Sequence, residues 1–140
     1  ADGKIEKANR YLASNFSISG EVVHGKGMGK GLGYATANIK IAENYKLIPK
    51  NGVYVVKAKL EGKMLTGMMN IGTNPTVGGA DKSVEVHFLD FNQDLYGKII
   101  KVELLYYIRE EKKFPNVDAL KQAMQKDENF TRNYFNTNQN

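Results

Sequence analysis

Six short segments, in which apolar and polar residues alternate, most constrain the fold of this chain. Neighbouring side chains of a β-strand point to opposite faces, so this alternation predicts strands. Turn residues such as Asn51-Gly52 separate the segments, with no long helix between them. Such strands favour a mainly β fold, an antiparallel barrel, over a parallel α/β sheet. The predicted strands are Ile18–His24, Ala37–Ile41, Val53–Leu60, Met64–Ile71, Val84–Leu89 and Ile99–Ile108.

The two ends of the chain carry helical spacing instead. Residues 3–13 predict a short N-terminal helix, and Asn116 is suited to cap a C-terminal helix over 117–136. We expect the apolar stripe of the second helix to pack on the barrel, and the polar triplet 127–129 to kink or break it. The stripe consists of Leu120, Ala123, Phe130 and Tyr134, with Met124 beside it.

Length and composition indicate an ordinary globular domain. The 140 residues suit one domain, which we divide into a linker remnant (1–16) and a barrel with its C-terminal helix (17–140). The absence of cysteine excludes disulfides and thiolate chemistry, and two histidines, His24 and His87, are too few for a histidine-built metal site. No apolar run approaches the roughly 18 residues of a membrane span, and no signal peptide is evident, so we expect a cytoplasmic protein.

Positive charge is concentrated in the first half of the chain. Residues 1–70 hold 11 Lys or Arg and 5 Asp or Glu, whereas residues 71–140 hold 9 and 10. This bias favours an anionic partner, such as a nucleotide, a nucleic acid or an acidic surface. Charge that serves only solubility explains the same numbers equally well.

Glycine occupies every second position from Gly25 to Gly33, with Lys26 and Lys30 between. Glycine lets backbone N–H groups crowd around an anion, so this segment is a candidate phosphate-binding loop. It is not a Walker A loop, because Gly31 follows Lys30 where Ser or Thr is required. A flexible hairpin loop is an equally good interpretation.

Thr36 and Asn38 follow the glycine segment and lie two residues apart on a predicted strand. They therefore share one face, where a hydroxyl and an amide oxygen could join phosphate oxygens and waters around Mg²⁺. From the spacing alone, a polar strand face without a ligand is the more common outcome.

Glu85 and His87 alternate with Val84, Val86 and Phe88. A carboxylate on a rigid strand suits general-base catalysis on a hydroxyl. The pattern alone fits a solvent-facing glutamate and a structural histidine better.

Residues 109–115 (Arg-Glu-Glu-Lys-Lys-Phe-Pro) leave the last predicted strand and lead to the helix. Charged residues that end in an aromatic ring can form a lid over a flat ligand. A solvated linker is the simpler interpretation.

Taken together and in order, these segments resemble the riboflavin kinase family. The match runs from about Ser17 to about Tyr134, and each motif alone is weak. The segments that carry it are Gly20–Gly25, Leu32-Gly33-Tyr34-Ala35-Thr36-Ala37-Asn38, Asn70-Ile71-Gly72-Thr73-Asn74-Pro75-Thr76, Val84-Glu85, Asp94–Lys98 and Arg109–Phe114. The resemblance implies a six-stranded antiparallel Greek-key barrel with a C-terminal helix, in agreement with the strand count.

The resemblance also implies an activity and a set of site residues. The family transfers the γ-phosphoryl group of ATP to the terminal ribityl hydroxyl of riboflavin with Mg²⁺, giving FMN and ADP. Glu85 matches the catalytic carboxylate, and Thr36 and Asn38 match the Mg²⁺ and phosphate ligands. Further nucleotide contacts match Gly25, Lys30, Phe88, Asp90 and Tyr96, and flavin contacts match Arg109, Lys112 and Phe114.

The chain departs from the family pattern at three positions. Ala35 replaces the usual proline before Thr36, Lys30 replaces a common arginine, and Val77 replaces a frequent aromatic residue. The first two could loosen the loop geometry, and none removes a group with an obvious chemical role. Residues 3–16 resemble the linker to an adenylyltransferase domain in bifunctional enzymes of FAD synthesis, so we expect an isolated C-terminal module.

Two other classes of function stay open from the sequence. A small basic barrel that binds single-stranded nucleic acid would use exposed aromatics, for which Tyr54, Tyr106 and Tyr107 are candidates. A flavin-binding barrel without kinase activity would not need Thr36, Asn38 and Glu85 together. We expect the kinase function, with riboflavin, FMN, ATP and ADP as ligands. We expect neither nucleic acid nor membrane as a partner.

Overall fold

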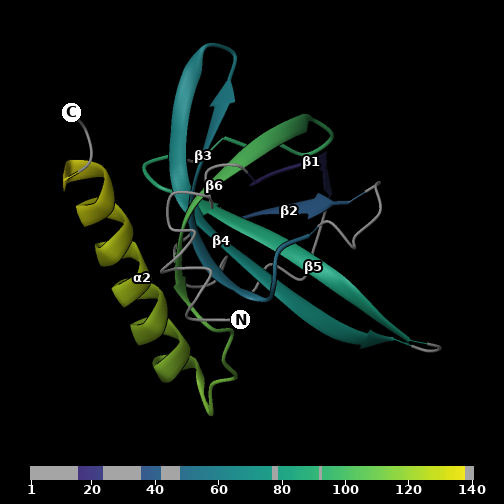
Figure 1. Cartoon of the computed structure of the whole chain (residues 1–140), viewed down its shortest axis with the longest axis vertical. Helices are drawn as coiled ribbons and strands as arrows, with labels where there is room; N and C mark the ends of the chain where they lie inside the picture. Colours follow the sequence, from purple (N-terminus) through teal and green to yellow (C-terminus); the bar gives the residue numbers. More distant parts are fainter. Residues whose placement is uncertain (1–15, 24–35, 42–47, 77–78, 92, 138–140) are drawn as a thin grey trace.

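The computed structural model describes residues 16–23, 36–41, 48–76, 79–91 and 93–137, which form a β-barrel with one helix alongside (Figure 1). The predicted N-terminal helix lies outside these residues, as do Gly25 and Lys30. The elements are β1 (Phe16–Val23), β2 (Thr36–Lys40), β3 (Gly52–Leu60), β4 (Lys63–Thr76), β5 (Gly79–Phe88), β6 (Ile99–Arg109) and α2 (Val117–Thr137).

The six strands form a closed antiparallel barrel in the order β1-β2-β5-β4-β3-β6. Strands β3, β4 and β5 are sequential neighbours, whereas β2 pairs with β5, and β6 pairs with both β1 and β3. Non-sequential pairing of this kind is Greek-key connectivity. The predicted fold class is therefore confirmed, and closure leaves the barrel no unpaired edge.

Strands β4 and β5 extend further than the sequence predicts. Their antiparallel register continues from Gly67↔Phe88 through Gly72↔Ser83 to Thr76↔Gly79. The predicted strands are shorter because the apolar alternation ends near Ile71 and resumes only at Val84. Backbone hydrogen bonds between two strands need no apolar side chains, so the ladder outlasts the pattern.

The barrel interior is filled by alternate residues of all six strands. Tyr54, Val56, Met69, Val86 and Leu104 lie there with at most 1% of their surface exposed. A smaller apolar layer covers the outer face of the barrel beneath α2. It comprises Val55 and Met68 from the strands and Met124 from the helix. Burial on both faces explains why β3 is apolar at consecutive positions.

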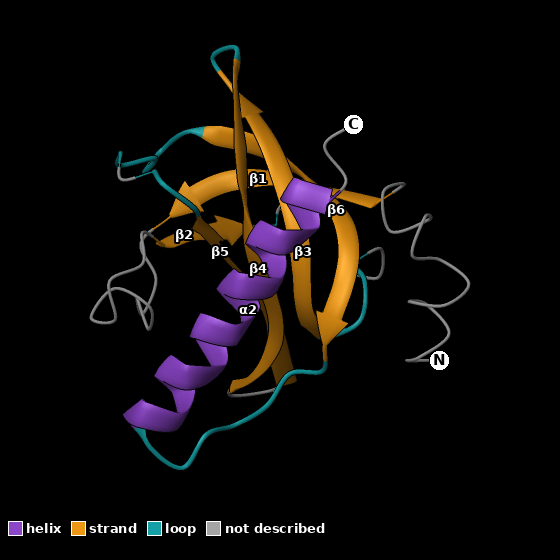
Figure 2. Ribbon diagram, turned by 90° about the vertical axis from the view of Figure 1, so that its left-hand side faces the viewer, coloured by secondary structure: helices purple, strands orange, loops and turns teal. Residues whose placement is uncertain are grey.

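Helix α2 packs along the outside of β3 and β4 (Figure 2). It begins at Val117 as predicted, because the side-chain oxygen of Asn116 accepts a hydrogen bond from the Ala119 N–H at 2.8 Å. The predicted kink at 127–129 is wrong, since the helix is continuous to Thr137. Polar side chains do not interrupt a helix when they find partners, and Glu128 pairs with Arg132 one turn later at 2.8 Å.

The buried face of α2 is more polar than its predicted apolar stripe. Met124, Asp127 and Thr131 are the buried residues, whereas Phe130 is 39% exposed. The Thr131 hydroxyl donates to the Asp127 carbonyl oxygen at 2.8 Å, so this residue is satisfied within the helix. The carboxylate of Asp127 has a partner outside the helix, in the cleft beside it.

Candidate active site

A cleft of about 780 Å³ lies between the outer face of the barrel and the N-terminal half of α2. Strands β2, β4 and β5 provide one wall, and the end of β6, residues 111–117 and α2 provide the other. The volume is within the range of small-molecule sites. The lining combines apolar side chains with a few polar groups, including Asn38, Asn70, Glu85, His87 and Asp127.

The strand wall is built by the pairing of β2 with β5. Thr36 lies opposite His87, and Asn38 lies opposite Glu85. Since these positions are two apart on each strand, all four side chains share the outer face. Thr36 Oγ1 and His87 Nδ1 are hydrogen-bonded at 3.1 Å. Thr36 and Asn38 therefore share one face of β2, as their spacing predicts, and the pairing places Glu85 opposite Asn38.

Glu85 occupies a partly dehydrated position on this wall. Its side chain is 15% exposed and lies in the cleft, so it is not the solvent-facing glutamate that the pattern favoured. Burial raises the pKa of the Glu85 carboxyl above its ordinary value. A carboxylate with a raised pKa is a stronger proton acceptor, which is the property that a general base needs.

His87 is buried beside Glu85, with 6% of its surface exposed. Its Nε2 atom lies 3.7 Å from Glu85 Oε1. Burial lowers the pKa of the imidazole to about 4, because the cation would lose its hydration. The ring is therefore neutral near pH 7.

A close strand contact holds the backbone at His87. Gly67 on β4 lies so near that a Cβ atom there would collide with the His87 carbonyl oxygen. Glycine is thus required at this point for β4 and β5 to approach.

The helix wall is joined to the barrel by an ion pair. Arg109 Nε donates to Asp127 Oδ1 at 2.9 Å, and Arg109 Nη2 donates to Asp127 Oδ2 at 2.7 Å. The Asp127 side chain is 7% exposed and that of Arg109 is 26% exposed. This two-point geometry fixes the guanidinium plane. The same guanidinium lies 5.7 Å from the centre of the Phe114 ring.

The cleft contains the three residues predicted to contact flavin, although their environments differ. Arg109 is bound to Asp127, Phe114 is half-buried, and Lys112 is exposed. The solvated-linker interpretation of residues 109–115 therefore fails at both Arg109 and Phe114. Glu111 also approaches the barrel, because its carboxylate fills the space above Gly72.

Apart from Asn38, the described residues predicted to contact the nucleotide, Thr36 among them, do not line the cleft. Phe88 is 4% exposed and belongs to the barrel core. Asp90 is bound by Arg132 of α2 at 2.9 and 3.0 Å, which lowers the pKa of that carboxyl. Tyr96 is 54% exposed, in the turn before β6. Gly25 and Lys30 lie outside the described residues.

Sequence reasoning missed several polar residues of the cleft, among them Asp127 and Asn70. Asp127 was assigned to a possible helix break, although an acidic residue three positions after Met124 lies on the same helical face. Asn70 opens one of the quoted motifs and was given no role, yet it lies opposite Glu85 across β4 and β5. Only the register of β4 and β5 shows that Asn70 and Glu85 lie opposite each other.

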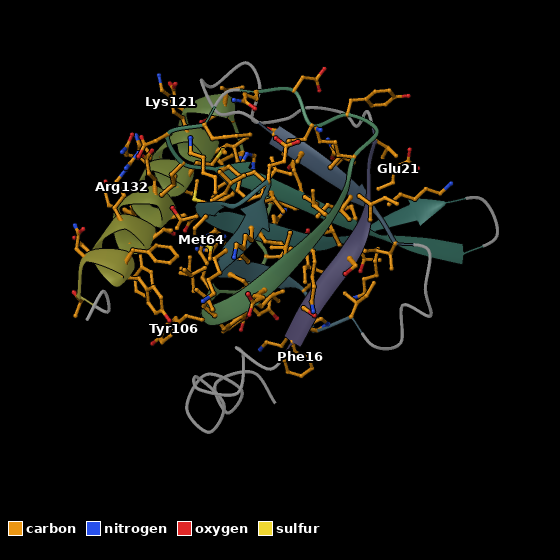
Figure 3. The ribbon with its side chains drawn as sticks, turned by 90° about the horizontal axis from the view of Figure 1, so that it is seen from above. Phe16, Glu21, Met64, Tyr106, Lys121 and Arg132 are labelled. Carbon is orange, nitrogen blue, oxygen red and sulfur yellow. The ribbon has the colours of Figure 1, made fainter. Side chains whose placement is uncertain are left out.

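The aromatic residues proposed for nucleic-acid stacking are not available for it. Tyr54 and Tyr107 are 1% and 4% exposed and contact each other in the core. Tyr106 packs against Phe130 and Tyr134 of α2, with ring centres 5.5 and 5.9 Å apart. Figure 3 shows Tyr106 on the side of the barrel near the helix. The stacking surface required by that alternative is therefore not formed by these three residues.

The described residues lack two kinds of feature. Within them, no three His, Asp or Glu side chains gather as a cluster able to hold a metal ion. No helix among them has the length and apolar character needed to cross a membrane.

Comparisons with known proteins agree with the geometry. The family model described as riboflavin kinase matches residues 12–135. The bifunctional riboflavin kinase/FMN adenylyltransferase of Escherichia coli (strain K12) is 42% identical over 136 residues, which cover 96% of this chain and 43% of that protein. The chain thus spans less than half the length of the curated relatives it matches.

Solved structures show the same fold. A crystal structure of riboflavin kinase from Trypanosoma brucei gives a TM-score of 0.63 at 29% identity, covering 88% of this chain and 81% of that one. A Streptococcus pneumoniae chain described as a macrolide-efflux protein gives a TM-score of 0.82 at 38% identity, covering 94% of this chain and 43% of that one. The family model spans most of the sequence and the barrel has a riboflavin kinase counterpart, so this chain belongs to the riboflavin kinase family.

Proposed function

We propose that this chain transfers the γ-phosphoryl group of ATP to the terminal ribityl hydroxyl of riboflavin, giving FMN and ADP. The observation that carries the proposal is the Glu85 carboxylate, held on a strand in the cleft with a raised pKa. The family membership supports the substrate class. Phosphoryl transfer depends mainly on alignment and charge stabilisation, and needs no covalent intermediate on the protein.

In this proposal Glu85 accepts the proton of the attacking hydroxyl. As the oxygen–phosphorus bond forms, the hydroxyl proton moves to the Glu85 carboxylate and the bond to the ADP oxygen breaks. The carboxylate also orients the hydroxyl before reaction. Asn38 and Asn70 lie opposite Glu85 on the two neighbouring strands, where their amides line the same wall.

The residues present fit a Mg²⁺ ion that is bound mainly by nucleotide. Thr36 and Asn38 provide a hydroxyl and an amide oxygen on one face of β2, the hard oxygen donors that Mg²⁺ prefers. Because few protein charges gather there, phosphate oxygens and waters would complete the shell. When bound, the ion would neutralise charge on the transferring phosphoryl group. Gly25 and Lys30 are proposed to contact the nucleotide on the same side.

The helix wall is proposed to bind the flavin. Phe114, Leu120 and Met124 give this part of the cleft an apolar character that suits a flat aromatic ring. Lys112 adds a cation at its rim. Arg109 and Asp127 neutralise each other, so their role is to hold the wall together.

The whole protein is proposed to carry a second domain. The bifunctional relatives combine riboflavin kinase with FMN adenylyltransferase, and this chain matches 43–44% of their length. We propose an N-terminal adenylyltransferase domain in the full-length protein. Because the reaction consumes ATP, we place it in the cytoplasm.

The direct test is to incubate the purified chain with riboflavin, ATP and Mg²⁺ and to separate the products by chromatography. We expect equal amounts of FMN and ADP, without FAD or pyrophosphate. Riboflavin binding without FMN would instead support a non-catalytic flavin barrel. Salt-dependent oligonucleotide binding without flavin binding would support a nucleic-acid module.

A further inference from the structure

A buried histidine lies between two groups of the proposed reaction, and the mechanism above does not use it. His87 Nδ1 contacts Thr36 Oγ1 at 3.1 Å, and His87 Nε2 lies 3.7 Å from Glu85 Oε1. Thr36 comes from β2, whereas His87 and Glu85 lie two residues apart on β5. One imidazole ring therefore spans the distance between the proposed metal ligand and the proposed base.

The surroundings of the ring determine where its proton lies. Only 6% of His87 is exposed, and its two ring nitrogens face different neighbours, Thr36 and Glu85. The Glu85 carboxylate is the acidic group that contacts the ring, and it faces Nε2. Electrostatic attraction therefore favours a hydrogen on Nε2, whereas Nδ1 holds the Thr36 hydroxyl by a hydrogen bond.

This assignment orients both neighbours of the ring. The hydrogen bond to Nδ1 fixes the direction of the Thr36 hydroxyl, so Oγ1 keeps lone pairs that point away from the ring. The Nε2 hydrogen faces Glu85 Oε1 and draws that oxygen toward the ring, so Oε2 is the oxygen left for a substrate hydroxyl. Each ring nitrogen therefore orients one neighbour: Nδ1 orients Thr36 and Nε2 orients Glu85.

We propose that His87 is a positioning residue, which orients the Thr36 oxygen for its ligand and the Glu85 carboxylate for the substrate hydroxyl. The proposal rests on the proposed kinase function and extends it. The strand ladder holds the ring in place, because His87 pairs with Thr36 on one side and Met68 on the other. Because only 6% of the residue is exposed, its neighbours leave the ring little space to shift.

Two substitutions separate the two contacts. In His87→Asn, the amide ends near the position of Nδ1 and can serve Thr36. In His87→Gln, it reaches the position of Nε2 and can serve Glu85. His87→Leu keeps an apolar volume and removes both polar contacts. The three variants are compared with the wild-type chain by urea unfolding, by Mn²⁺–ADP affinity from electron paramagnetic resonance, and by kcat at saturating substrates.

We expect His87→Leu to weaken Mn²⁺–ADP binding and to lower kcat, each by about 10-fold or more, as is usual for groups that orient metal ligands. His87→Asn should restore most of the Mn²⁺–ADP affinity and little of kcat. His87→Gln should show the reverse. A residue that only fills space would not give opposite effects in these two folded variants.

The proposal is overturned if His87→Asn and His87→Gln change the Mn²⁺–ADP affinity and kcat equally. It is also overturned if a folded His87→Leu variant retains the wild-type affinity and kcat. The Asn and Gln comparison decides the matter even if the Leu variant fails to fold. A wild-type chain that forms no FMN refutes the proposed function itself, which is a separate result. The Mn²⁺–ADP measurement is independent of turnover.

Discussion

The two walls of the cleft are held in place by different means. The strand wall carries Asn38 and Glu85 on β2 and β5, and Thr36 lies on the same strand face outside the lining. Backbone pairing fixes each of these positions. The helix wall is joined to the barrel at the cleft by the Arg109–Asp127 ion pair, between groups 18 residues apart. Groups that need accurate alignment thus lie on paired strands, whereas groups proposed to recognise the flavin lie on a loop and a helix.

This contrast predicts two kinds of variant. Changes on the strand wall should lower kcat and leave the free energy of unfolding nearly unchanged. Changes on the helix wall should raise the KM for riboflavin and weaken the fold, because a lost contact there also loosens the docking of α2.

The largest effect is expected for Glu85→Gln. The amide keeps the shape of the side chain but cannot accept the proton, so kcat should fall by at least about 10²-fold. Steady-state kinetics at saturating riboflavin and ATP measure this directly. Near-normal turnover would exclude Glu85 as the base.

The same substitution tests the electrostatics of the strand wall. A carboxyl whose pKa is raised by burial destabilises the fold while it is ionised, and this cost disappears as the pH falls through its folded pKa. At pH 7, Glu85→Gln should therefore unfold at the same or a slightly higher urea concentration. Wild-type kcat should decline as the pH falls through the raised pKa, since only the ionised form accepts a proton. A pH-independent kcat in the acid range contradicts this assignment.

Thr36→Val and Asn38→Leu come next in size. Each removes an oxygen donor at nearly constant volume, so the Mg²⁺ concentration needed for half-maximal turnover should rise about 10-fold. The KM for riboflavin should change less, because the flavin is proposed to bind at the other wall. An unchanged Mg²⁺ requirement in both variants would show that the metal lies elsewhere.

Arg109→Met should act on the other wall. It leaves the Asp127 carboxylate without a partner in a site that is 7% exposed. Because Arg109 itself is partly exposed, we expect the free energy of unfolding to fall by about 2 kcal/mol. This value lies between those typical of surface and buried ion pairs. The KM for riboflavin should rise several-fold, with a smaller change in kcat.

The double variant Arg109→Met with Asp127→Leu provides the matched control. It removes the unpaired charge, so urea unfolding should show recovery of most of the lost stability. The KM should stay raised, since the loop is no longer held by the ion pair. If both quantities recover together, the ion pair has no role beyond neutralising its own charges.

The smallest effect is expected for Gly72→Ala. A methyl group there would occupy the space of the Glu111 carboxylate, so the start of the loop must shift. We expect the KM for riboflavin to rise about two-fold, which corresponds to about 0.4 kcal/mol. In a Glu111→Ala background the space is empty, and Gly72→Ala should then leave the KM unchanged. Equal effects in both backgrounds would mean that Glu111 is not responsible.

Most of the fold could be predicted because it follows from local patterns. Alternation located all six strands, and Asn116 marked the start of α2. The end of β4 and the start of β5 were missed because the ladder between them continues through polar sequence. The predicted helix break at 127–129 was wrong. The local sequence pattern treats Asp127 as solvated, whereas in the fold Arg109 neutralises its charge.

The sequence alone determined the strands and the C-terminal helix, and it supplied candidates for the chemical groups. Glu85, Thr36 and Asn38 were predicted from side-chain type and from motifs in order. Tertiary structure decided which of these groups meet. Strand register and barrel closure placed Thr36 against His87 and moved Phe88 into the core, and helix docking placed Asp127 on Arg109. The physical reason is that alternation and capping act over a few residues, whereas burial, pairing and pKa depend on neighbours that are distant in the chain.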